Sequence, residues 1–457
     1  MFVLAAVTVF AAWAGDIGVV AVVVCAVAVV CRSWLLALLL VAVAVGGLVR
    51  SEQSWASLEP DRLGDHRGWV RLVDDPQPYP SSTRVIVEIE GERFEIWSRG
   101  RAQRQRVATW RGGEWVAMEG RRVRLDDERA GRVAWQHVVG EFEMEWASDV
   151  DPGDSVARAS NRVRASIERG SSHLPGDDAA LFRGLVVGDD RDQPRDMIDR
   201  FRASGLSHLT AVSGQNVSFL LAAAGPLLRR LRPWARWAFT IGLIAWFVAL
   251  TRYEPSILRA GVMAGLSTTA FLLGRDRSPV RILAVAVTGL VLVDPLLVWS
   301  IGFWLSVGAT LGVSALGPWL ATRIRRIDPT GIFALPLGVT LGAQIGVVVP
   351  AVLVFGRLPL VSIPANLLAV PVAGAVMLYG MPAGLVAGWV PFTAPVLMFP
   401  ARLGTRWVDT VASLGARLEP DPPVQFAGWA LIAVAVVVLV VMTRNTAPTH
   451  GDLPPHR

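Results

Sequence analysis

Apolar stretches occupy both ends of this chain, and one charged stretch separates them. Residues 1–49 are almost continuously apolar, and apolar runs return at residue 204 and continue to residue 444. Several of these runs approach the roughly 20 residues that an α-helix needs to cross a bilayer. The pattern therefore predicts N-terminal transmembrane helices over residues 1–49 and a helical transmembrane domain over residues 204–444.

Polar interruptions within these two regions predict the individual helices. The first region divides into helices at Phe2–Ala14, Ile17–Cys31 and Trp34–Val49. The second region predicts spans at Val217–Leu228, Trp237–Thr251, Ser256–Leu273, Val280–Val293, Ile301–Leu320, Ile332–Phe355, Ile363–Val390 and Val424–Met442. The span that starts at Ile363 contains several prolines, so we expect it to be broken or kinked.

The charged stretch, residues 50–150, alternates apolar and polar side chains with a period of two. This period predicts short β-strands, at Trp69–Val73, Thr83–Glu90, Arg93–Trp97, Glu114–Met118, Arg121–Leu125 and Arg132–Val138. Gly113 and Gly120 are expected to form turns that lead into paired strands. The spacing fits a small barrel of the OB type. Because a fold does not fix a function, a barrel that binds nucleic acid or sugar and a purely structural barrel both stay open.

Residues 151–203 have the pattern of a helical linker. Val156, Val163 and Ile167 recur at helical spacing, and arginines occupy the other side of the helix. We expect a solvated surface helix in this linker.

Two segments near the C-terminus complete the pattern. Five polar residues recur at steps of three or four, which places them on one helical face: Arg402, Arg406, Asp409, Ser413 and Arg417. We expect this helix to lie in the membrane interface; a spanning helix with a wet face is the alternative. Residues 445–457 contain prolines and no apolar run, so we expect a disordered tail.

Composition and charge placement favour a membrane protein and orient it. Charged residues make up 18% of the chain and hydrophobic residues 53%, whereas a soluble domain has about 25% charged residues. Arginine clusters follow Leu228, Leu273 and Leu320, and the positive-inside rule places these loops in the cytoplasm. The predicted fold class is therefore a polytopic α-helical membrane protein with a small extracytoplasmic β-rich, OB-like domain.

The basic residues are all arginine, 44 in number. Guanidinium groups pair bidentately with phosphate oxygens, so this bias fits a phosphate-binding protein. A GC-rich genome produces the same bias, and composition alone does not separate the two explanations.

The segment Phe201–Val217, FRASGLSHLTAVSGQNV, is too polar for a lipid-facing helix. Irregular backbone at membrane depth is tolerated where it lines a cavity or is buried in protein, so we interpret the segment as a broken helix along an aqueous path. The half-helix after the break would present its N-terminus to an anion. An ordinary loop with a helix cap is the alternative. The candidate path residues are Gly205, His208, Ser213, Gly214, Gln215 and Asn216.

Arg259 and Asn366 are further candidates, because both are polar residues in predicted spans. Arg259 either faces a phosphate in the path or extends to the outer headgroups. His208 is either a proton carrier or a hydrogen-bonded structural histidine. For Asn366, as for Gln344, interhelical hydrogen bonding is the alternative.

Several functional classes lack their signatures in this sequence. After Val217 no aspartate or glutamate lies deep in a predicted span, although proton-driven and sodium-driven carriers normally need one. The chain has no Walker A loop, no HExxH zinc motif and no histidine-rich metal motif. We therefore expect no enzymatic activity, no metal and no cofactor, and a path that suits a polyanion better than a cation.

Five ordered motifs resemble those of the ComEC family of bacterial competence proteins. The motif GLSHLTAVSGQNV is similar to the family's GLSHLLAISGLHV, and ALFRGLVVGDDR, centred on Gly188 and Asp189, is similar to its LxLGDR stretch. Three later segments are similar to its P-S-x-x-R-A, DP…GFQLSF and FG…S…ANLLAVP elements: EPSILRAGVMAGL, DPLLVWSIGFWLSVGATLG and FGRLPLVSIPANLLAVP. The N-terminal helices and the β-rich region match the family's usual front end.

The resemblance implies a channel that passes one DNA strand across the bacterial cytoplasmic membrane during natural transformation. It makes Gly205, His208 and the stretch Ser213–Asn216 candidate channel residues, together with Arg259. Gln215-Asn216 stands where the family has Leu-His, so any role of that histidine is lost, and Phe303-Trp304 stands where Phe-Gln is usual. We expect a short form without the metallo-β-lactamase-like domain that many members carry at the C-terminus.

The implied partners are single-stranded DNA and the lipid bilayer, with a separate DNA receptor, nuclease and cytoplasmic ATP-driven motor; a homo-oligomer stays open. Trp69, Trp97, Trp110 and Trp115 are candidate stacking platforms for a DNA strand, with core packing as the alternative. Two other functions also stay open: a transporter of another anionic polymer or solute, and a non-transporting scaffold for envelope machinery.

Overall fold

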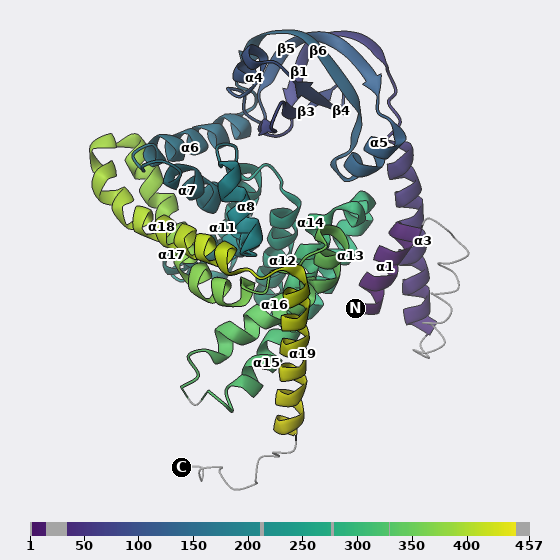
Figure 1. Ribbon diagram of the computed structural model, residues 1–457. Helices are drawn as coiled ribbons and strands as arrows, with labels where there is room; N and C mark the ends of the chain where they lie inside the picture. The colour runs from purple at the N-terminus through teal and green to yellow at the C-terminus, as the bar shows by residue number, and fades with distance from the viewer. Residues whose placement is uncertain (1, 15–33, 211–213, 276–277, 329, 445–457) are drawn as a thin grey trace. The chain divides into compact units, whose positions relative to one another are not determined.

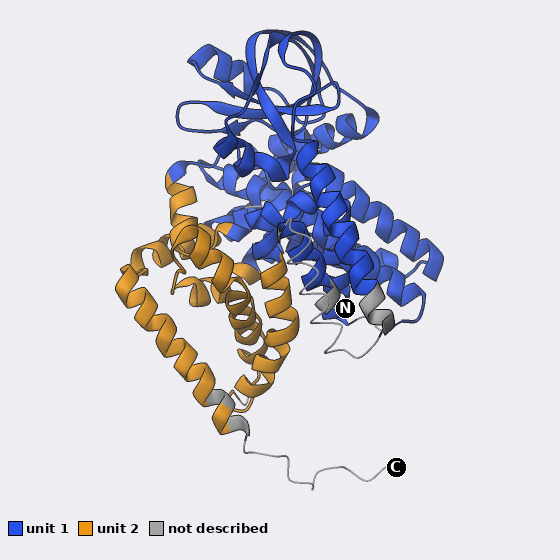
Figure 2. Ribbon diagram, turned by 90° about the vertical axis from the view of Figure 1, so that its right-hand side faces the viewer, with its two compact units in different colours: residues 1–195, 208–306, 372–407 blue, residues 196–207, 307–371, 408–457 orange. Residues whose placement is uncertain are grey.

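The computed structural model describes residues 2–14, 34–210, 214–275, 278–328 and 330–444 (Figure 1). It contains two compact units (Figure 2). Unit 1 comprises residues 1–195, 208–306 and 372–407, and unit 2 comprises residues 196–207, 307–371 and 408–457. The helix expected at Ile17–Cys31 and the tail expected at 445–457 lie outside the described residues.

A six-stranded sheet forms the β-rich part of unit 1 (Figure 1). Its strands are β1 (Gly64–Leu72), β2 (Gln77–Pro78), β3 (Thr83–Ile89), β4 (Glu92–Ser98), β5 (Trp115–Arg124) and β6 (Val138–Asp151). The strand order is β1-β5-β6-β4-β3-β2, and an added pairing of β1 with β3 closes the sheet into a barrel. Only the β4–β6 pair is parallel among the described strands. Apolar side chains such as Val70, Val87, Phe94 and Phe142 fill the interior.

Gly120 does not form the turn that the sequence predicted, because β5 runs straight through it. No side chain fits at this position of the strand, because a Cβ there would overlap the carbonyl oxygen of Glu143 and approach the ring of Phe142 to 2.9 Å. The two strands expected at Glu114–Met118 and Arg121–Leu125 are therefore one strand.

The strand predicted at Arg132–Val138 is also wrong. Residues Asp127–Val133 form helix α5, and a 3-10 helix follows at Ala134–Gln136. Asp126 begins α5, because its carboxylate accepts a hydrogen bond from the backbone N–H of Arg129 at 2.8 Å. A further short helix between β4 and β5, α4 (Arg101–Val107), was not anticipated.

Three helices follow the barrel: α6 (Ser155–Ser171), α7 (Asp178–Val187) and α8 (Arg195–Ala203). Helix α6 is not the solvated helix that was expected. Ile167 is fully buried, Ser166 donates to the backbone oxygen of Leu385 at 3.2 Å, and a Cβ on Gly170 would overlap the backbone of Gly384. Small residues on α6 therefore let another helix pack directly against it.

Helices α6 and α7 belong to unit 1, whereas α8 belongs to unit 2 from Asp196 onward. The other helices of unit 1 include most of the predicted spans. They are α1 (Phe2–Ala14), α3 (Trp34–Ala56), α9 (Ser207–Thr210), α10 (Gly214–Leu228), α11 (Pro233–Leu250), α12 (Pro255–Leu272) and α13 (Pro279–Val293). A proline is the first residue of each of α11, α12 and α13, where its missing N–H costs nothing. A 3-10 helix, Pro295–Trp299, leads into the next helix.

Helices α14 (Ile301–Leu311), α17 (Ser362–Trp389) and α18 (Ala394–Leu418) contribute residues to both units. A 3-10 helix, Pro391–Thr393, lies between α17 and α18. Of the two outcomes expected for α17, a break or a kink, the break is absent, since the helix is continuous over 28 residues; the kink stays a prediction. The first proline of α17, Pro364, lies in the first helical turn, where no backbone N–H is needed.

Unit 2 also contains a π-helical turn (Gly312–Leu316), α15 (Gly317–Ile324), α16 (Ala334–Phe355) and α19 (Pro422–Arg444). Glycines bring α16 against the chain between α14 and α15. A Cβ on Gly342 would lie 2.7 Å from the carbonyl oxygen of Gly312, and a Cβ on Gly338 would lie 2.7 Å from the backbone nitrogen of Ala321. The two backbones therefore touch at positions where no side chain fits.

Gly342→Ala is expected to destabilise the protein, because its new methyl group overlaps the facing backbone, and overpacking typically costs about 1–3 kcal/mol. The matched control is Gly242→Ala on α11, where a Cβ meets nothing within 4 Å and alanine favours the helix by roughly 0.5–1 kcal/mol. Thermal unfolding in detergent should show a lower midpoint for Gly342→Ala and an unchanged or higher midpoint for Gly242→Ala. Equal midpoints would contradict the tight packing.

Four of the described helical segments are long and apolar enough to cross a membrane: Pro233–Leu250, Ile301–Ile324, Ala334–Phe355 and Ser362–Trp389. The number rises to five if Pro391–Leu418 and Pro422–Val438, which meet at a bend of 105°, are one span. Helix α13 is apolar but shorter.

Helix α18 exposes an apolar stripe made of Val396, Phe399, Leu403, Leu414 and Leu418. Two residues of the polar face that the sequence predicted form ion pairs within the protein. Arg406 forms an ion pair with Asp178 at 3.1 Å, and Asp409 forms one with Arg200 at 3.0 Å. An interfacial position for this helix stays a prediction.

Candidate functional site

The candidate residues chosen from the sequence fall into two groups, one in each unit. Gly214, Gln215 and Asn216 form the first turn of α10, and Arg259 lies on α12; all four belong to unit 1, as does His208, which is exposed on α9. Gly205 and Asn366 belong to unit 2. Ser213 lies outside the described residues.

Arg259 is a buried charge on an otherwise apolar helix, with 3% of its surface exposed. Its guanidinium group donates to the Ser306 hydroxyl, and Nη1 lies 3.5 Å from the sulfur of Met263. The side chain therefore points into the protein, and its contact with a phosphate stays a prediction, as does the alternative that it extends to the outer headgroups.

Gly214 allows α10 to begin beside this arginine. A Cβ at position 214 would approach the Cβ of Ala260 to 2.9 Å and Nη2 of Arg259 to 3.6 Å. The first turn of α10 and the guanidinium group are thus close neighbours. Because a helix N-terminus carries a partial positive charge and free N–H groups, the two features together provide an environment suited to an anion.

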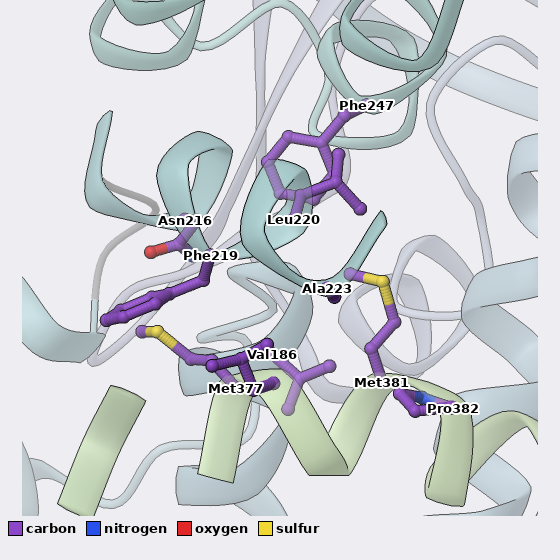
Figure 3. Close-up of a pocket in the computed structure, with 10 residues that line it drawn as sticks. Val186, Asn216, Phe219, Leu220, Ala223, Phe247, Met377, Met381 and Pro382 are labelled. Carbon is purple, nitrogen blue, oxygen red and sulfur yellow. The ribbon is translucent and has the colours of Figure 1, made fainter. Parts of the chain in front are cut away.

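Asn216 is buried near the end of α7, where its amide donates to the backbone oxygen of Leu185 at 3.4 Å. It borders a void of about 50 Å³, and Figure 3 shows Asn216, Phe219, Met377 and Met381 around this space. A void of that size is large enough for water, but its lining is mainly apolar. Access of water to this segment from either side of a membrane stays a prediction.

Gly205 and Asn366 both lie against Ser362 in unit 2. Gly205 has φ +72°, and a Cβ there would lie 2.5 Å from the Cβ of Ser362. The Ser362 hydroxyl accepts a hydrogen bond from Gln344 at 2.9 Å, and Asn366 donates to the Ser362 backbone oxygen at 2.7 Å. The bond of Gln344 joins α16 to α17, which agrees with the interhelical hydrogen bond given as its alternative role. The bond of Asn366 lies within α17.

A buried cluster of charges in unit 1 was missed by the sequence analysis. Its centre is Arg164 on α6, with 4% of its surface exposed. Nη2 of Arg164 contacts Asp75 of the barrel at 2.8 Å, and Nη1 donates to the backbone oxygens of Val187 at 3.1 Å and Leu250 at 3.3 Å. One guanidinium group thus joins the barrel to the ends of α7 and α11.

Arg252, in the turn between α11 and α12, completes this cluster. Its Nη2 contacts Asp75 at 3.0 Å and Asn161 at 2.6 Å. Arg252 and Tyr253 have φ values of +61° and +57°, which are uncommon for residues with a side chain. Such backbone persists only where surrounding contacts hold it, and the bonds to Asp75 and Asn161 provide them.

The carboxyl groups of the cluster have pKa values that move in opposite directions. Burial opposes the charged form of Asp75, but the guanidinium groups of Arg164 and Arg252 outweigh it and lower its pKa. Burial, aided by the charge of Asp75, raises the pKa of Asp74 to about 6. Burial also raises the pKa of Glu254 to about 7, with Asp74 contributing. Asp75 is therefore a permanent anion, whereas Asp74 and Glu254 bind protons near neutrality.

Asp189 also belongs to this cluster, since its Oδ2 lies 3.8 Å from Nη2 of Arg164, and it could be recognised from the sequence. Gly188 and Asp189 lie in a motif that the sequence analysis singled out, and the structure explains them. Gly188 ends α7 with φ +67°, and Asp189 receives two hydrogen bonds from Arg191, both at 2.7 Å. Arg164 had no such signal, because it was one arginine on the charged side of a helix. Within the described ranges no group of histidine, cysteine, aspartate or glutamate is arranged to hold a metal ion.

Comparison with protein families matches this chain over residues 185–447 to the family described as "Competence protein". The chain is 27% identical over 263 residues to "Uncharacterized protein YcaI" of Escherichia coli (strain K12), a match that covers 54% of this chain and 33% of that protein. It is 29% identical over 204 residues to "ComE operon protein 3" of Bacillus subtilis (strain 168), which covers 44% of this chain and 25% of that protein. The chain thus matches only a third or less of the length of these relatives. No solved structure matches it.

Proposed function

The chain belongs to the competence protein family, and on that premise we propose that it passes a single strand of DNA across the bacterial cytoplasmic membrane. The family match covers α10 to α19, which include the helices that are long and apolar enough to span a bilayer. This segment also contains the turn at Gly214 and the buried charge of Arg259.

Arg259 is the observation that carries the proposal. A guanidinium group buried among apolar helices is costly, and such residues usually mark a path or a binding site. Helices α10, α11, α12 and α13 contain no aspartate or glutamate. Arg259 is thus a positive charge beside the first turn of α10, and these helices carry no carboxylate near it. Such a site favours a phosphate chain as the transported species over a metal cation or a proton.

The barrel is proposed to lie outside the cytoplasm and to be of the OB type. Its closed order, β1-β3-β4-β6-β5 and back to β1, with β4 and β6 parallel, is compatible with a five-stranded Greek-key barrel. Of the four tryptophans named as candidate stacking platforms, Trp110 is in the barrel core and Trp97 is partly buried beside Tyr79, whereas Trp69 and Trp115 are exposed. The exposed pair remains available for stacking.

Other proteins are proposed to supply the remaining steps. The sequence contains no Walker A loop, so a partner with an ATP site would pull the strand. A separate receptor would deliver DNA, and a separate nuclease would remove the second strand. The channel itself is proposed to act without catalysis.

Uptake of fluorescent DNA in cells with the gene deleted, and in the same cells with the gene restored, tests this function. We expect internal fluorescence to fall to background on deletion, because in this proposal the strand crosses the membrane through this protein, and to return on restoration. DNA should still bind to the surface of the deletion cells. Internalisation at the wild-type level without the gene would refute the transport role.

A further inference from the structure

Half of the exposed arginines on the barrel form ion pairs with carboxylates. Four such pairs are Arg62–Glu90, Arg67–Glu119, Arg124–Glu59 and Arg132–Glu128, with N–O distances of 3.4, 3.7, 3.8 and 3.7 Å. Acidic residues also outnumber arginines over residues 57–151. The barrel as a whole therefore does not attract a polyanion.

The segment around α4 is where arginines without an ion pair gather, although Arg121 on β5 is also exposed and forms no ion pair with any described residue. No acidic residue lies between Glu95 and Glu114, and five arginines occur there: Arg99, Arg101, Arg104, Arg106 and Arg111. Arg111 forms an ion pair with Glu168 at 2.6 Å. None of the other four forms an ion pair with any residue that the structure describes. We call Arg99, Arg101, Arg104 and Arg106 the α4 basic surface.

The core of the barrel fixes this surface in place. Val107, at the end of α4, is fully buried, and Trp110 has 2% of its surface exposed; both belong to the barrel core. Gln103 also donates to the backbone oxygen of Met144 on β6 at 3.4 Å. The arginines thus project from a helix that is anchored on its other side, so little order has to be gained when a ligand binds.

The exposed side chains of α4 point to a soluble polyanion and not to a lipid surface. Arg99, Arg101 and Arg106 are exposed, and Arg104 is half-buried with an Nε that lacks a hydrogen-bond partner. No large apolar side chain between residues 98 and 113 is exposed, whereas helices that bind membrane surfaces insert an apolar face. Like charges crowded in one short segment repel each other, and a ligand with several regularly spaced anions relieves that repulsion.

We propose that the α4 basic surface binds the phosphate backbone of single-stranded DNA before the strand enters the membrane. The inference rests on the proposed function and adds the receiving site on this chain. Guanidinium groups bind phosphate bidentately, and four of them within eight residues suit consecutive phosphates of one strand. Contacts of this kind carry affinity without sequence preference.

The test compares two variants of the full chain in nanodiscs made of zwitterionic lipid. One variant carries Arg99→Gln, Arg101→Gln, Arg104→Gln and Arg106→Gln. The matched control removes as many charges from the same barrel, at carboxylate-paired positions, with Arg62→Gln, Arg67→Gln, Arg124→Gln and Arg132→Gln. The probe is fluorescein-labelled oligothymidylate, and its anisotropy is measured as a function of protein and salt concentration.

The α4 variant is expected to bind the oligonucleotide at least roughly tenfold more weakly than the wild type. Its slope of log affinity against log salt should be smaller by about 3, because each phosphate contact with a single strand contributes about 0.7. The control variant should bind within about twofold of the wild type. Both variants keep Val107 and Trp110, so their thermal midpoints should match.

Three results would overturn the inference. One is an affinity of the α4 variant equal to that of the wild type. Another is an equal loss of affinity in the control variant, because binding would then depend only on the total charge of the barrel and not on the α4 basic surface. The third comes from repeating the comparison with vesicles that contain anionic lipid: if the α4 variant binds those vesicles more weakly but binds oligothymidylate like the wild type, the surface is a lipid site. If the α4 variant binds DNA normally but deletion of the gene still abolishes uptake, the inference fails and the transport function stands. If the α4 variant binds DNA more weakly but deletion leaves uptake normal, the transport function fails and only a DNA-binding surface remains.

Discussion

Replacing Arg164 with methionine is expected to destabilise unit 1 by roughly 3 kcal/mol, near the lower end of the cost of breaking a buried ion pair. Methionine keeps the unbranched, apolar part of the side chain but removes the guanidinium group and both of its hydrogen-bonding arms. Asp75 then loses its contact at 2.8 Å while it stays buried as an anion, and the carbonyl oxygens of Val187 and Leu250 lose a donor. Arg252 still contacts Asp75, which keeps the cost from being higher.

Thermal unfolding in detergent, followed by tryptophan fluorescence, measures this effect. The control is Arg162→Met on the same helix, because Arg162 is exposed and its loss should leave the midpoint almost unchanged. Adding Asp75→Asn to Arg164→Met should recover part of the lost stability, since the buried charge is then removed together with its partner. A midpoint for Arg164→Met equal to that of Arg162→Met would show that the cluster does not hold the barrel in place.

Helix positions were largely predictable from the sequence, whereas the barrel was predictable only in part. The prediction Val280–Val293 differs by one residue from α13, because a long apolar run with a proline before it leaves little choice. Strand β6 was missed although its sequence carried a readable signal, because GEFEMEW over residues 140–146 alternates apolar and acidic side chains. Helix α5 was misassigned although Asp126, its cap, was visible, since short apolar alternation in Arg132–Val138 also fits a strand.

The charged cluster could not be predicted, and the reason is physical. Arg164 and Asp75 are 89 residues apart in the chain, and an arginine on a charged helix face is normally solvated. Only the tertiary fold brings a carboxylate and two helix ends to it. By contrast, Arg259 was identifiable, because a charge within an apolar helix is unusual whatever surrounds it. Sequence patterns thus find isolated charges in apolar context and miss charges that become buried together.

Arg259→Gln is expected to lower DNA uptake by about 10- to 100-fold in cells that contain normal amounts of the protein. A hydrogen bond to a charged group contributes about 1.5–3 kcal/mol, and that is the interaction a phosphate loses when glutamine replaces the guanidinium. Glutamine keeps the stem of the side chain and a polar end, although it is too short to keep the contact of Arg259 with the Ser306 hydroxyl, so the packing of α12 should change little. Uptake of fluorescent DNA and the membrane level of the protein are measured in the same cells.

A second pair of variants tests whether uptake depends on the packing beside Arg259 or on the packing of α10 in general. Gly214→Ala adds a methyl group that presses on Ala260 and lies near Arg259, whereas Gly225→Ala, on the same helix, adds one where nothing lies within 4 Å. We expect Gly214→Ala to reduce uptake and Gly225→Ala to leave it unchanged. Arg259→Lys keeps the positive charge and should retain more uptake than Arg259→Gln. If Arg259→Gln cells take up DNA at the wild-type rate, the strand does not pass this residue, and a buried arginine that only stabilises the helices would be the better account.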